Sequence, residues 1–225
     1  MPSLFETPRW KKTDESDRLD YCQNHEQLYL FYGRIYTPRK GYKHSKTNQL
    51  VLNLKKKPTS SNERELYWKS KAINQFASEV IDFLSPNLPP NKPRALIPMP
   101  PSKTRQHPDY DDRMEQVAQL VVQRLVVQRF SNLRYWPLLK SIKDVEGSHT
   151  GNISRNPEEL FKTIDVEKRE VGNYLNEEIV YVIDDVLTSG SHFMAARQHI
   201  LKYFPNIQIN GLFWAKTQSI EDFDF

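Results

Sequence analysis

The chain has 225 residues but a single cysteine, Cys22, and no internal repeat or low-complexity segment. One cysteine excludes an intrachain disulfide. A lone thiol fits a reducing compartment, so we expect the protein to be cytoplasmic. Repeat architectures and compositionally biased linkers are not indicated, which favours an ordinary globular fold.

Long apolar runs are also missing. No window approaches the ~20 apolar residues that cross a bilayer, and the start, Met1 to Glu6, has no apolar signal region. We therefore expect no membrane partner. Hydrophobic residues make up 38% of the chain, charged residues 27%, and the mean hydropathy is −0.71. At this length the chain can nevertheless bury one sizeable core.

The net charge is +4 and the isoelectric point is near 9.0. Basic residues concentrate between Arg34 and Lys57, and tyrosines are interleaved with them. A nucleic-acid or protein partner is compatible with this basic N-terminal region. The alternative that we favour is a set of solvated hairpin faces with lysine-guarded edges. A phosphorylated substrate would account for part of the positive charge.

Two domains are predicted from the change in pattern near residue 60. Residues 1 to 23 are charged and aperiodic, which indicates an arm with little structure of its own. Leu28 to Tyr36 alternates aromatic and aliphatic residues, and Gln49 to Leu54 shows a similar alternation, which predicts two strands joined by a long basic loop. Residues 1–60 would thus be an N-terminal arm and β-hairpin extension, and residues 61–225 an α/β domain.

Strands and helices are expected to alternate through the second domain. Asn62 and Glu65 suit a capping box at the start of a long helix. In chain order we predict a helix over 63–84, a strand over 95–97, a helix from 114, a strand over 135–142, a helix from 156, a strand over 179–183, a helix from 193 and a strand over 207–214.

The segment from Glu178 to His192 carries the strongest functional signal. An apolar strand is followed by Asp184 and Asp185, whose burial without partners would be costly. We expect this pair to face a cation or a set of hydroxyls at the carboxyl edge of a sheet. A small, hydroxyl-rich turn, Thr188 to Ser191, then feeds a helix N-terminus and suits a phosphate. The plainer alternative is a solvated Asp-Asp turn before an ordinary helix.

This segment resembles the phosphoribosyl-pyrophosphate (PRPP) signature of the type I phosphoribosyltransferases: a hydrophobic strand, two acidic residues, two hydrophobics and a Thr/Ser-Gly loop. The resemblance implies that family's parallel sheet flanked by helices, with an N-terminal β-containing extension or hood. It also implies that Asp184 and Asp185 hold the ribose hydroxyls and a magnesium ion. The 5′-phosphate would then be held by Thr188, Ser189, Gly190, Ser191 and His192. Two positions depart from the signature: Tyr181 in the strand, and His192 where a Thr or Ser is usual.

Two further loops extend the resemblance. The run Ile97 to Lys103 is similar to the Pro-x-Pro loop of ComF-like members, which implies that Ser102 and Lys103 contact pyrophosphate and that Arg113 anchors the loop or adds charge. A proline-stiffened connection is the alternative. The segment 143–155 corresponds to the loop that closes over PRPP in the family. His149 and Arg155 are candidates to meet substrate there, although surface roles fit them equally.

The implied reaction is displacement of pyrophosphate from PRPP by a nitrogen nucleophile, with magnesium bound through PRPP. No residue identifies the acceptor base. Two other classes remain open: a non-catalytic PRPP- or nucleotide-binding regulator, and a DNA-uptake component or a retron-like bacterial defence effector. ComF-like proteins often carry a zinc-binding cysteine cluster, but only Cys22 and His25 stand near that position, so we expect no zinc. A homo-oligomer is compatible with the sequence.

Overall fold

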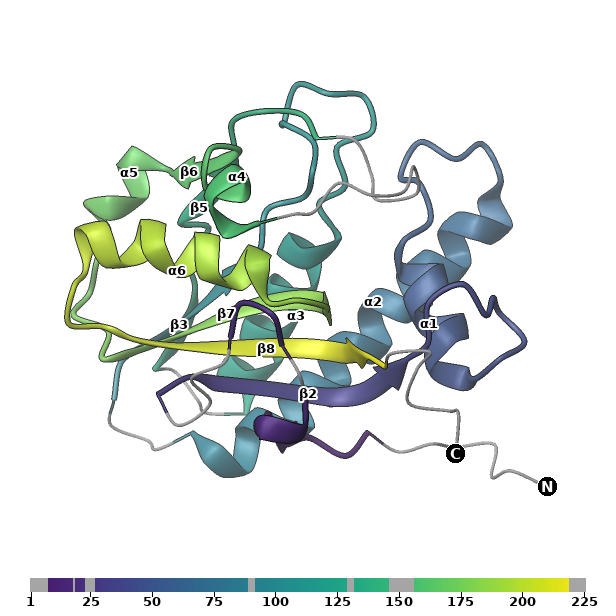
Figure 1. Ribbon diagram of the computed structural model, residues 1–225, viewed down its shortest axis with the longest axis horizontal. Coiled ribbons are helices and arrows are strands. Elements are labelled where there is room, and N and C mark those ends of the chain that lie inside the picture. The colour runs from purple at the N-terminus through teal and green to yellow at the C-terminus, as the bar shows by residue number, and fades with distance from the viewer. Residues whose placement is uncertain are drawn as a thin grey trace.

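The computed structural model describes residues 8–17, 19–22, 27–88, 92–128, 132–145 and 156–218. This part of the chain forms a six-stranded sheet with helices on both faces, and a small two-stranded sheet beside it (Figure 1). The predicted fold class, an α/β fold whose central sheet is mostly parallel and flanked by helices, is confirmed.

The elements follow one another in the order β1 (Lys11–Lys12), η1 (Glu15–Asp17), β2 (Tyr29–Tyr36), α1 (Lys46–Leu54), α2 (Glu63–Leu84), η2 (Ser85–Asn87), β3 (Arg94–Pro98), α3 (Arg113–Val127), β4 (Leu133–Tyr135), β5 (Leu139–Ser141), α4 (Pro157–Phe161), β6 (Ile164–Val166), α5 (Lys168–Val171), β7 (Ile179–Leu187), α6 (Ser191–Tyr203) and β8 (Gln208–Thr217).

The main sheet has the strand order β1-β2-β8-β7-β3-β4. β1 is antiparallel to β2, and every other neighbouring pair is parallel. β7 therefore lies inside the sheet, between β8 and β3. Since parallel strands end at the same edge, the segments that follow β3, β7 and β8 meet at one carboxyl edge.

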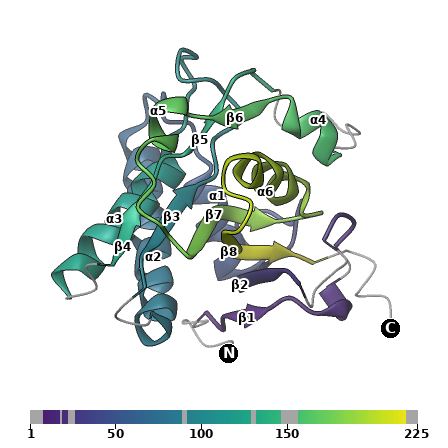
Figure 2. The same ribbon diagram turned by 90° about the vertical axis from the view of Figure 1, so that its left-hand side faces the viewer.

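Side chains of β7 alternate between two hydrophobic clusters, as expected for a strand buried on both faces. Val180 and Val182 pack in the cluster that contains residues of α6, whereas Tyr181 and Ile183 pack in the cluster that contains residues of α2 and α3. Figure 2 shows α6 on one side of the strands and α2 and α3 on the other. This three-layer packing fixes the position of the β7 end.

The long helix α2 begins and ends where the sequence predicts. The Oδ1 atom of Asn62 accepts a hydrogen bond from the Arg64 amide at 3.1 Å, so Asn62 is the N-cap. Glu65 instead accepts a bond from the Ser60 hydroxyl at 2.7 Å. The cap is therefore confirmed, but its reciprocal glutamate contact is replaced by a bond to the preceding turn.

The hairpin predicted for the N-terminal region is wrong. β2 is a strand, but the segment predicted as its partner is helix α1. The Ser45 hydroxyl accepts from the Asn48 amide at 3.0 Å and caps this helix, while Leu50, Val51 and Leu54 are buried at helical spacing. β2 pairs with β8 instead, in parallel.

Two other expectations need correction. The first 23 residues were expected to be an arm with little structure of its own, but where the structure describes them they contain β1 and η1, and Trp10 stacks on Phe83 with 4.7 Å between ring centroids. The strand predicted over 135–142 is divided at Pro137 between β4 and β5, which belong to different sheets. The domain boundary at residue 60 stays a prediction.

Candidate active site

Strand β7 carries both acidic candidates into the carboxyl edge of the sheet. Asp184 and Asp185 lie within the strand, which continues to Leu187, rather than after it. The Asp185 amide donates to Oδ1 of Asp184 at 2.8 Å. Because successive side chains point to opposite faces of a strand, the two carboxylates have different surroundings.

The hydroxyl-rich turn forms a tight connection from β7 into α6. Gly190 is the N-cap of α6 and has φ +84°, a left-handed conformation that favours glycine. The Ser189 hydroxyl donates to the Ser191 hydroxyl at 3.1 Å. Thr188 is exposed and Ser191 is buried at the first turn of the helix. Hydroxyls thus surround the positive end of a helix of 13 residues, as an anion site requires.

The N-terminal segment holds this turn from outside. The Tyr21 amide donates to the Ser189 carbonyl at 3.1 Å, and the Cys22 thiol donates to the Gly190 carbonyl at 3.7 Å. Burial raises the pKa of the Cys22 thiol to about 12, so the thiol stays protonated as this donor. The conformation of the turn therefore depends on residues about 170 positions earlier in the chain.

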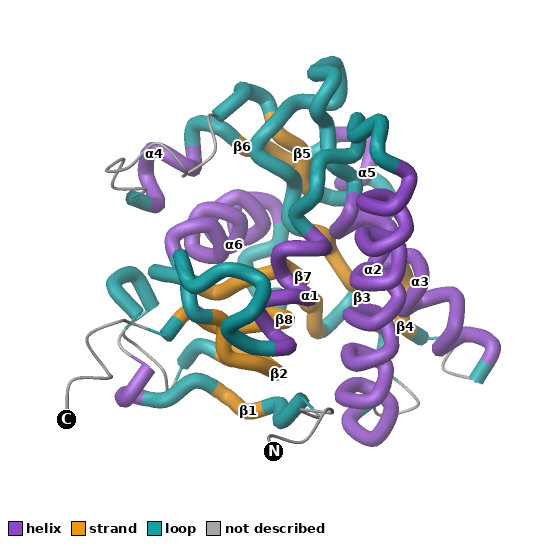
Figure 3. Tube along the Cα trace, turned by 90° about the vertical axis from the view of Figure 1, so that its right-hand side faces the viewer, coloured by secondary structure: helices purple, strands orange, loops and turns teal. Residues whose placement is uncertain are grey.

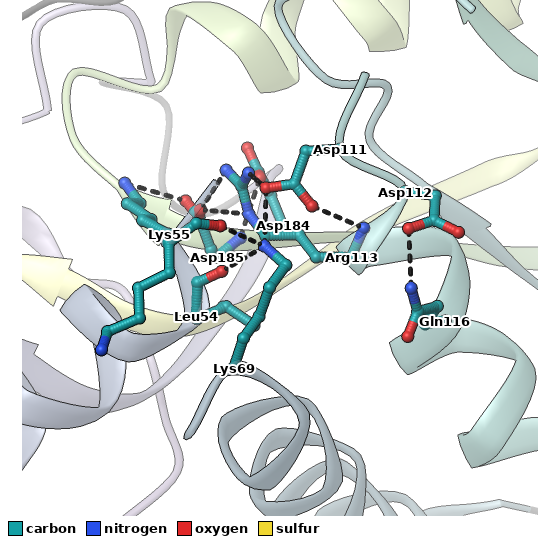
Figure 4. A network of polar contacts seen from close by, with 10 residues as sticks. Leu54, Lys55, Lys69, Asp111, Asp112, Arg113, Gln116, Asp184 and Asp185 are labelled. Carbon is teal, nitrogen blue, oxygen red and sulfur yellow. Dashed lines mark hydrogen bonds and ion pairs between the residues drawn. The ribbon is translucent and has the colours of Figure 1, made fainter. Parts of the chain in front are cut away.

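Asp185 is held by two cations from other elements (Figure 4). The guanidinium of Arg113, the first residue of α3, donates to Oδ2 of Asp185 from Nη2 at 2.8 Å and from Nε at 3.2 Å. The ammonium of Lys55, directly after α1, lies 3.4 Å from Oδ1. Both oxygens of this carboxylate are therefore compensated.

The network continues away from the strand through Asp111. Oδ2 of Asp111 accepts from Nη1 of Arg113 at 2.7 Å and from Nζ of Lys69 at 2.8 Å. The same ammonium donates to the carbonyls of Leu54 and Lys56, each at 2.8 Å. Opposite charges alternate from β7 to α2, so burial of the ions is compensated by pairing.

The two neighbouring carboxyls differ in protonation. Burial and the adjacent negative charge of Asp185 raise the pKa of Asp184 to about 7. Burial alone would also raise the pKa of Asp185, but the charges of Lys55 and Arg113 outweigh it and hold that pKa below its ordinary value. At neutral pH, Asp185 is ionised and Asp184 can exist in either form.

The loop after β3 lies beside the end of β7. The Met99 amide donates to the Ile183 carbonyl at 2.9 Å, which fixes the start of this loop next to the two aspartates. The Ser102 carbonyl accepts from the Val145 amide at 2.8 Å. Lys103 is half-buried, and its charge adds to the Thr104 amide in lowering the pKa of Asp144.

Most of the predicted site residues are thereby brought to one edge of the sheet. They are Asp184, Asp185, Thr188, Ser189, Gly190, Ser191, His192, Ser102 and Lys103. His192 lies half-buried in the first turn of α6. His149 and Arg155 fall outside the described residues.

Three charged residues of the network, Lys55, Lys69 and Asp111, were not singled out from the sequence as site residues. Lys69 carries a usable signal, because it stands at helical spacing from Ile73 and Phe76 and thus on the buried face of α2. A lysine on such a face needs a buried partner. Asp111 had no comparable signal.

Among the residues that the structure describes, no cluster of three or more His, Cys, Asp or Glu side chains could hold a metal ion. None of the described helices is long and apolar enough to cross a membrane.

Fold and site together define an α/β protein with an acidic strand end and a hydroxyl-lined turn at the carboxyl edge. No protein-family model and no curated protein matches this chain. Among solved structures, it is similar to the Helicobacter pylori xanthine-guanine-hypoxanthine phosphoribosyltransferase, with 10% identity and a TM-score of 0.34 over 67% of this chain and 85% of that chain. A similarity of this size identifies no family.

Proposed function

We propose that the chain binds PRPP through its ribose 5-phosphate moiety and transfers the phosphoribosyl group to a nitrogen nucleophile, with release of pyrophosphate. The observation that carries the proposal is the arrangement at the end of β7. Two carboxyls there are separated by two apolar residues, Val186 and Leu187, from a turn whose left-handed Gly190 starts α6. This order places groups for sugar hydroxyls and groups for a phosphate a few residues apart.

The residues of the turn would bind the 5′-phosphate through hydroxyls and the first amides of α6. Thr188, Ser189 and Ser191 supply the hydroxyls, and His192 would add a donor at the first turn. Asp184 and Asp185 would accept hydrogen bonds from the ribose hydroxyls. Arg113 and Lys55 would keep Asp185 ionised and fixed in place, so that this carboxylate is preorganised.

Magnesium would be held by Asp184 and Asp185 together with the substrate. Because Asp185 already pairs with two cations, Asp184 is the better placed of the two to meet a further cation. The bound ion would supply charge neutralisation for the pyrophosphate.

Pyrophosphate would leave toward the loop after β3. Ser102 and Lys103 lie on that loop, beside β7, and would bind the negative charge that develops on the leaving group. Arg155 would add charge from the segment that follows residue 145. The attacking nitrogen would approach the anomeric carbon from the opposite side.

Calorimetric titration of the full chain with PRPP, with and without magnesium, tests the proposal. We expect magnesium-dependent binding by the wild type and at least a tenfold loss in Asp184→Asn. Asp82→Asn, an exposed change on α2, is the matched control and should bind like the wild type. Equal binding by all three proteins, or binding by none while each remains folded, would refute the assignment.

A second function, binding of PRPP without turnover, fits the same ion pairs equally well. Asp185 is already held by Arg113 and Lys55, which suits a rigid binding site as well as a catalytic one. Release of pyrophosphate distinguishes the two functions. A transferase releases it when supplied with its acceptor, and a regulator binds PRPP but releases none with any of the common nucleobases.

A further inference from the structure

Helix α2 presents an aromatic and basic face to solvent, outside the candidate active site. Four exposed side chains at helical spacing form this face: Arg64, Tyr67, Trp68 and Lys71. We call these four residues the outer face of α2. Figure 3 shows α2 beside α1 and α3, which pack against the buried side of the helix. Lys69, the lysine of α2 that bonds to the network around Asp185, lies on that buried side.

Two large rings on the outer face are left in water. Tyr67 is 54% exposed and Trp68 is 42% exposed. Their ring centroids lie 5.3 Å apart with 76° between the planes, so the rings meet edge to face. The other tryptophans are packed inside the protein: Trp136 and Trp214 are fully buried, and Trp10 stacks on another ring. Adjacent exposed rings on a protein whose other tryptophans are packed indicate a binding surface.

The same face carries cations beside its rings. The ammonium of Lys71 lies 5.3 Å from the centroid of the Tyr67 ring. Arg64 precedes Trp68 by four residues, which is about one helical turn. The surrounding segment is also strongly basic: residues 39–71 contain ten Lys and Arg against two Asp and Glu, although the whole chain has a net charge of only +4. Such a concentration of positive charge attracts a polyanion.

The combination of rings and cations limits the choice of partner. A two-fold contact between copies of this chain would bring the cations of both outer faces together, which is unfavourable. A stable protein interface buries roughly 800 Å² on each partner around an apolar centre, and two rings on one helix do not supply such a centre. A single strand of nucleic acid requires only exposed rings on which bases stack and cations that meet phosphates.

We propose that the outer face of α2 binds single-stranded nucleic acid without sequence preference. One base stacks on Trp68, whose ring is held edge to face by Tyr67. Arg64 and Lys71 are seven residues apart, about 10 Å along the helix axis, and they neutralise phosphates on either side of that base. The surface is separate from the turn before α6 and requires no PRPP.

The direct test is fluorescence anisotropy of a labelled oligodeoxythymidylate titrated with the full chain. An oligonucleotide of about 15 nucleotides matches the site sizes of single-strand binders. We expect Trp68→Leu to bind at least tenfold more weakly, because the stacking ring is lost. Trp68→Phe keeps a ring and should bind like the wild type. Tyr203→Leu removes a tyrosine of α6 that is 43% exposed, and it is the matched aromatic control.

Salt dependence tests the cations. Removing one phosphate contact from a single-strand site lowers the slope of log K against log salt by about 0.7. We expect this change in Arg64→Gln and in Lys71→Gln. Lys168→Gln, an exposed change in α5, should keep the slope of the wild type.

Tryptophan fluorescence locates the bound strand. Because Trp68 is exposed and Trp136 and Trp214 are fully buried, a base stacked on Trp68 should quench the fluorescence of the wild type. Trp68→Phe should bind the same oligonucleotide without this quenching. Equal quenching in the two proteins would place the strand elsewhere and overturn the proposal.

Four other results would also overturn it. They are no binding of the oligonucleotide, equally tight binding of a duplex of the same length, unchanged binding by Trp68→Leu, and competition by polyglutamate as effective as that by the unlabelled strand. The last result would identify the face as a site for an acidic protein. Titration of the same variants with PRPP and magnesium is independent of these outcomes, because the outer face of α2 contributes no residue to the candidate active site.

Discussion

At the scale of single residues, two adjacent aspartates have opposite protonation behaviour because their partners differ. Asp185 pairs with Arg113 and Lys55, whereas the charge that acts most strongly on Asp184 is that of Asp185 itself. Lys55 and Arg113 also lower the pKa of Asp184, but burial and the charge of Asp185 outweigh them. The pair therefore offers one fixed anion and one group that titrates near neutral pH.

This difference predicts how stability depends on pH. The pKa of Asp184 is about 7 in the folded chain, above its ordinary value of 3.8, so the folded state binds more protons between these values. The contribution of Asp184 to the free energy of unfolding should therefore fall as pH rises from about 4 to about 7. In Asp184→Asn this loss should shrink by on the order of 2 kcal/mol. Urea unfolding with EDTA across this range measures it. Parallel pH profiles for the two proteins would contradict the assignment.

Gly190 gives a second prediction. A Cβ atom there would lie 2.4 Å from the Cys22 sulfur, and φ is +84°. Gly190→Ala should therefore cost about 2–4 kcal/mol of stability through strain and overlap. Gly172→Ala is the matched control, since the nearest atom to its Cβ is 3.7 Å away and its φ is −67°. Thermal unfolding of both variants measures the difference. If Gly190→Ala is as stable as the control, the turn can accommodate a Cβ atom and the prediction is wrong.

The residues that could be predicted are those that lie together in sequence. The two aspartates and the turn that follows form one continuous segment, so a site for hydroxyls and a phosphate can be predicted there without the structure. The cations of the network could not be predicted as partners, because Lys55 and Arg113 reach Asp185 from 130 and 72 positions away. Nothing in local spacing indicates which charge meets which.

At the scale of elements, α1 and α2 are joined through one buried ammonium. Lys69 of α2 donates to the carbonyl of Leu54, the last residue of α1, to the carbonyl of Lys56 in the turn that follows, and to Asp111, just before α3. The orphan carbonyls of a helix terminus are thereby satisfied by a cation, which also suits the helix dipole. This single side chain positions Lys55, the residue that follows α1.

Lys69→Met should destabilise the protein by about 3 kcal/mol, because Asp111 would lose a buried partner and two carbonyls would lose their donor. Lys71→Met, an exposed change on the same helix, should stay within about 0.5 kcal/mol of the wild type. Denaturant unfolding compares the two. If both variants are equally stable, Lys69 does not hold these elements together.

The type of an element could be predicted where the spacing of its apolar residues fits either a helix or a strand, but not both. The 22-residue helix α2 has an apolar stripe that no strand could share. The segment 49–54 is shorter, and its leucines at alternate positions fit a strand as well as one face of a helix. The segment forms a helix because Ser45 caps its N-terminus and because Leu50 and Leu54 pack against α2.

At the scale of the whole molecule, the N-terminal region is part of the central sheet. β2 pairs with β8 over most of its length, and Arg34 of β2 forms a buried ion pair with Glu79 of α2 at 2.6 Å. The Trp214 indole of β8 donates to the same carboxylate at 2.7 Å. One buried glutamate thus links two strands and a helix, and sequence patterns gave no indication of this link.

Residues 61–225 alone should therefore fail to fold as the full chain does. Deleting residues 1–60 removes β2. This deletion would expose the edge of β8 and leave Glu79 without the guanidinium of Arg34. Circular dichroism and denaturant unfolding compare the fragment with the full chain. We expect no cooperative transition in the fragment. A cooperative transition of similar midpoint would instead establish residues 1–60 as a separate extension.

The central claim is that the end of β7 and the turn before α6 bind ribose 5-phosphate. A crystal structure of the full chain with PRPP and magnesium tests it most directly. We predict the 5′-phosphate against Thr188 to Ser191 and the ribose hydroxyls beside Asp184 and Asp185. Density for PRPP at any other place, with this turn empty, would contradict the account.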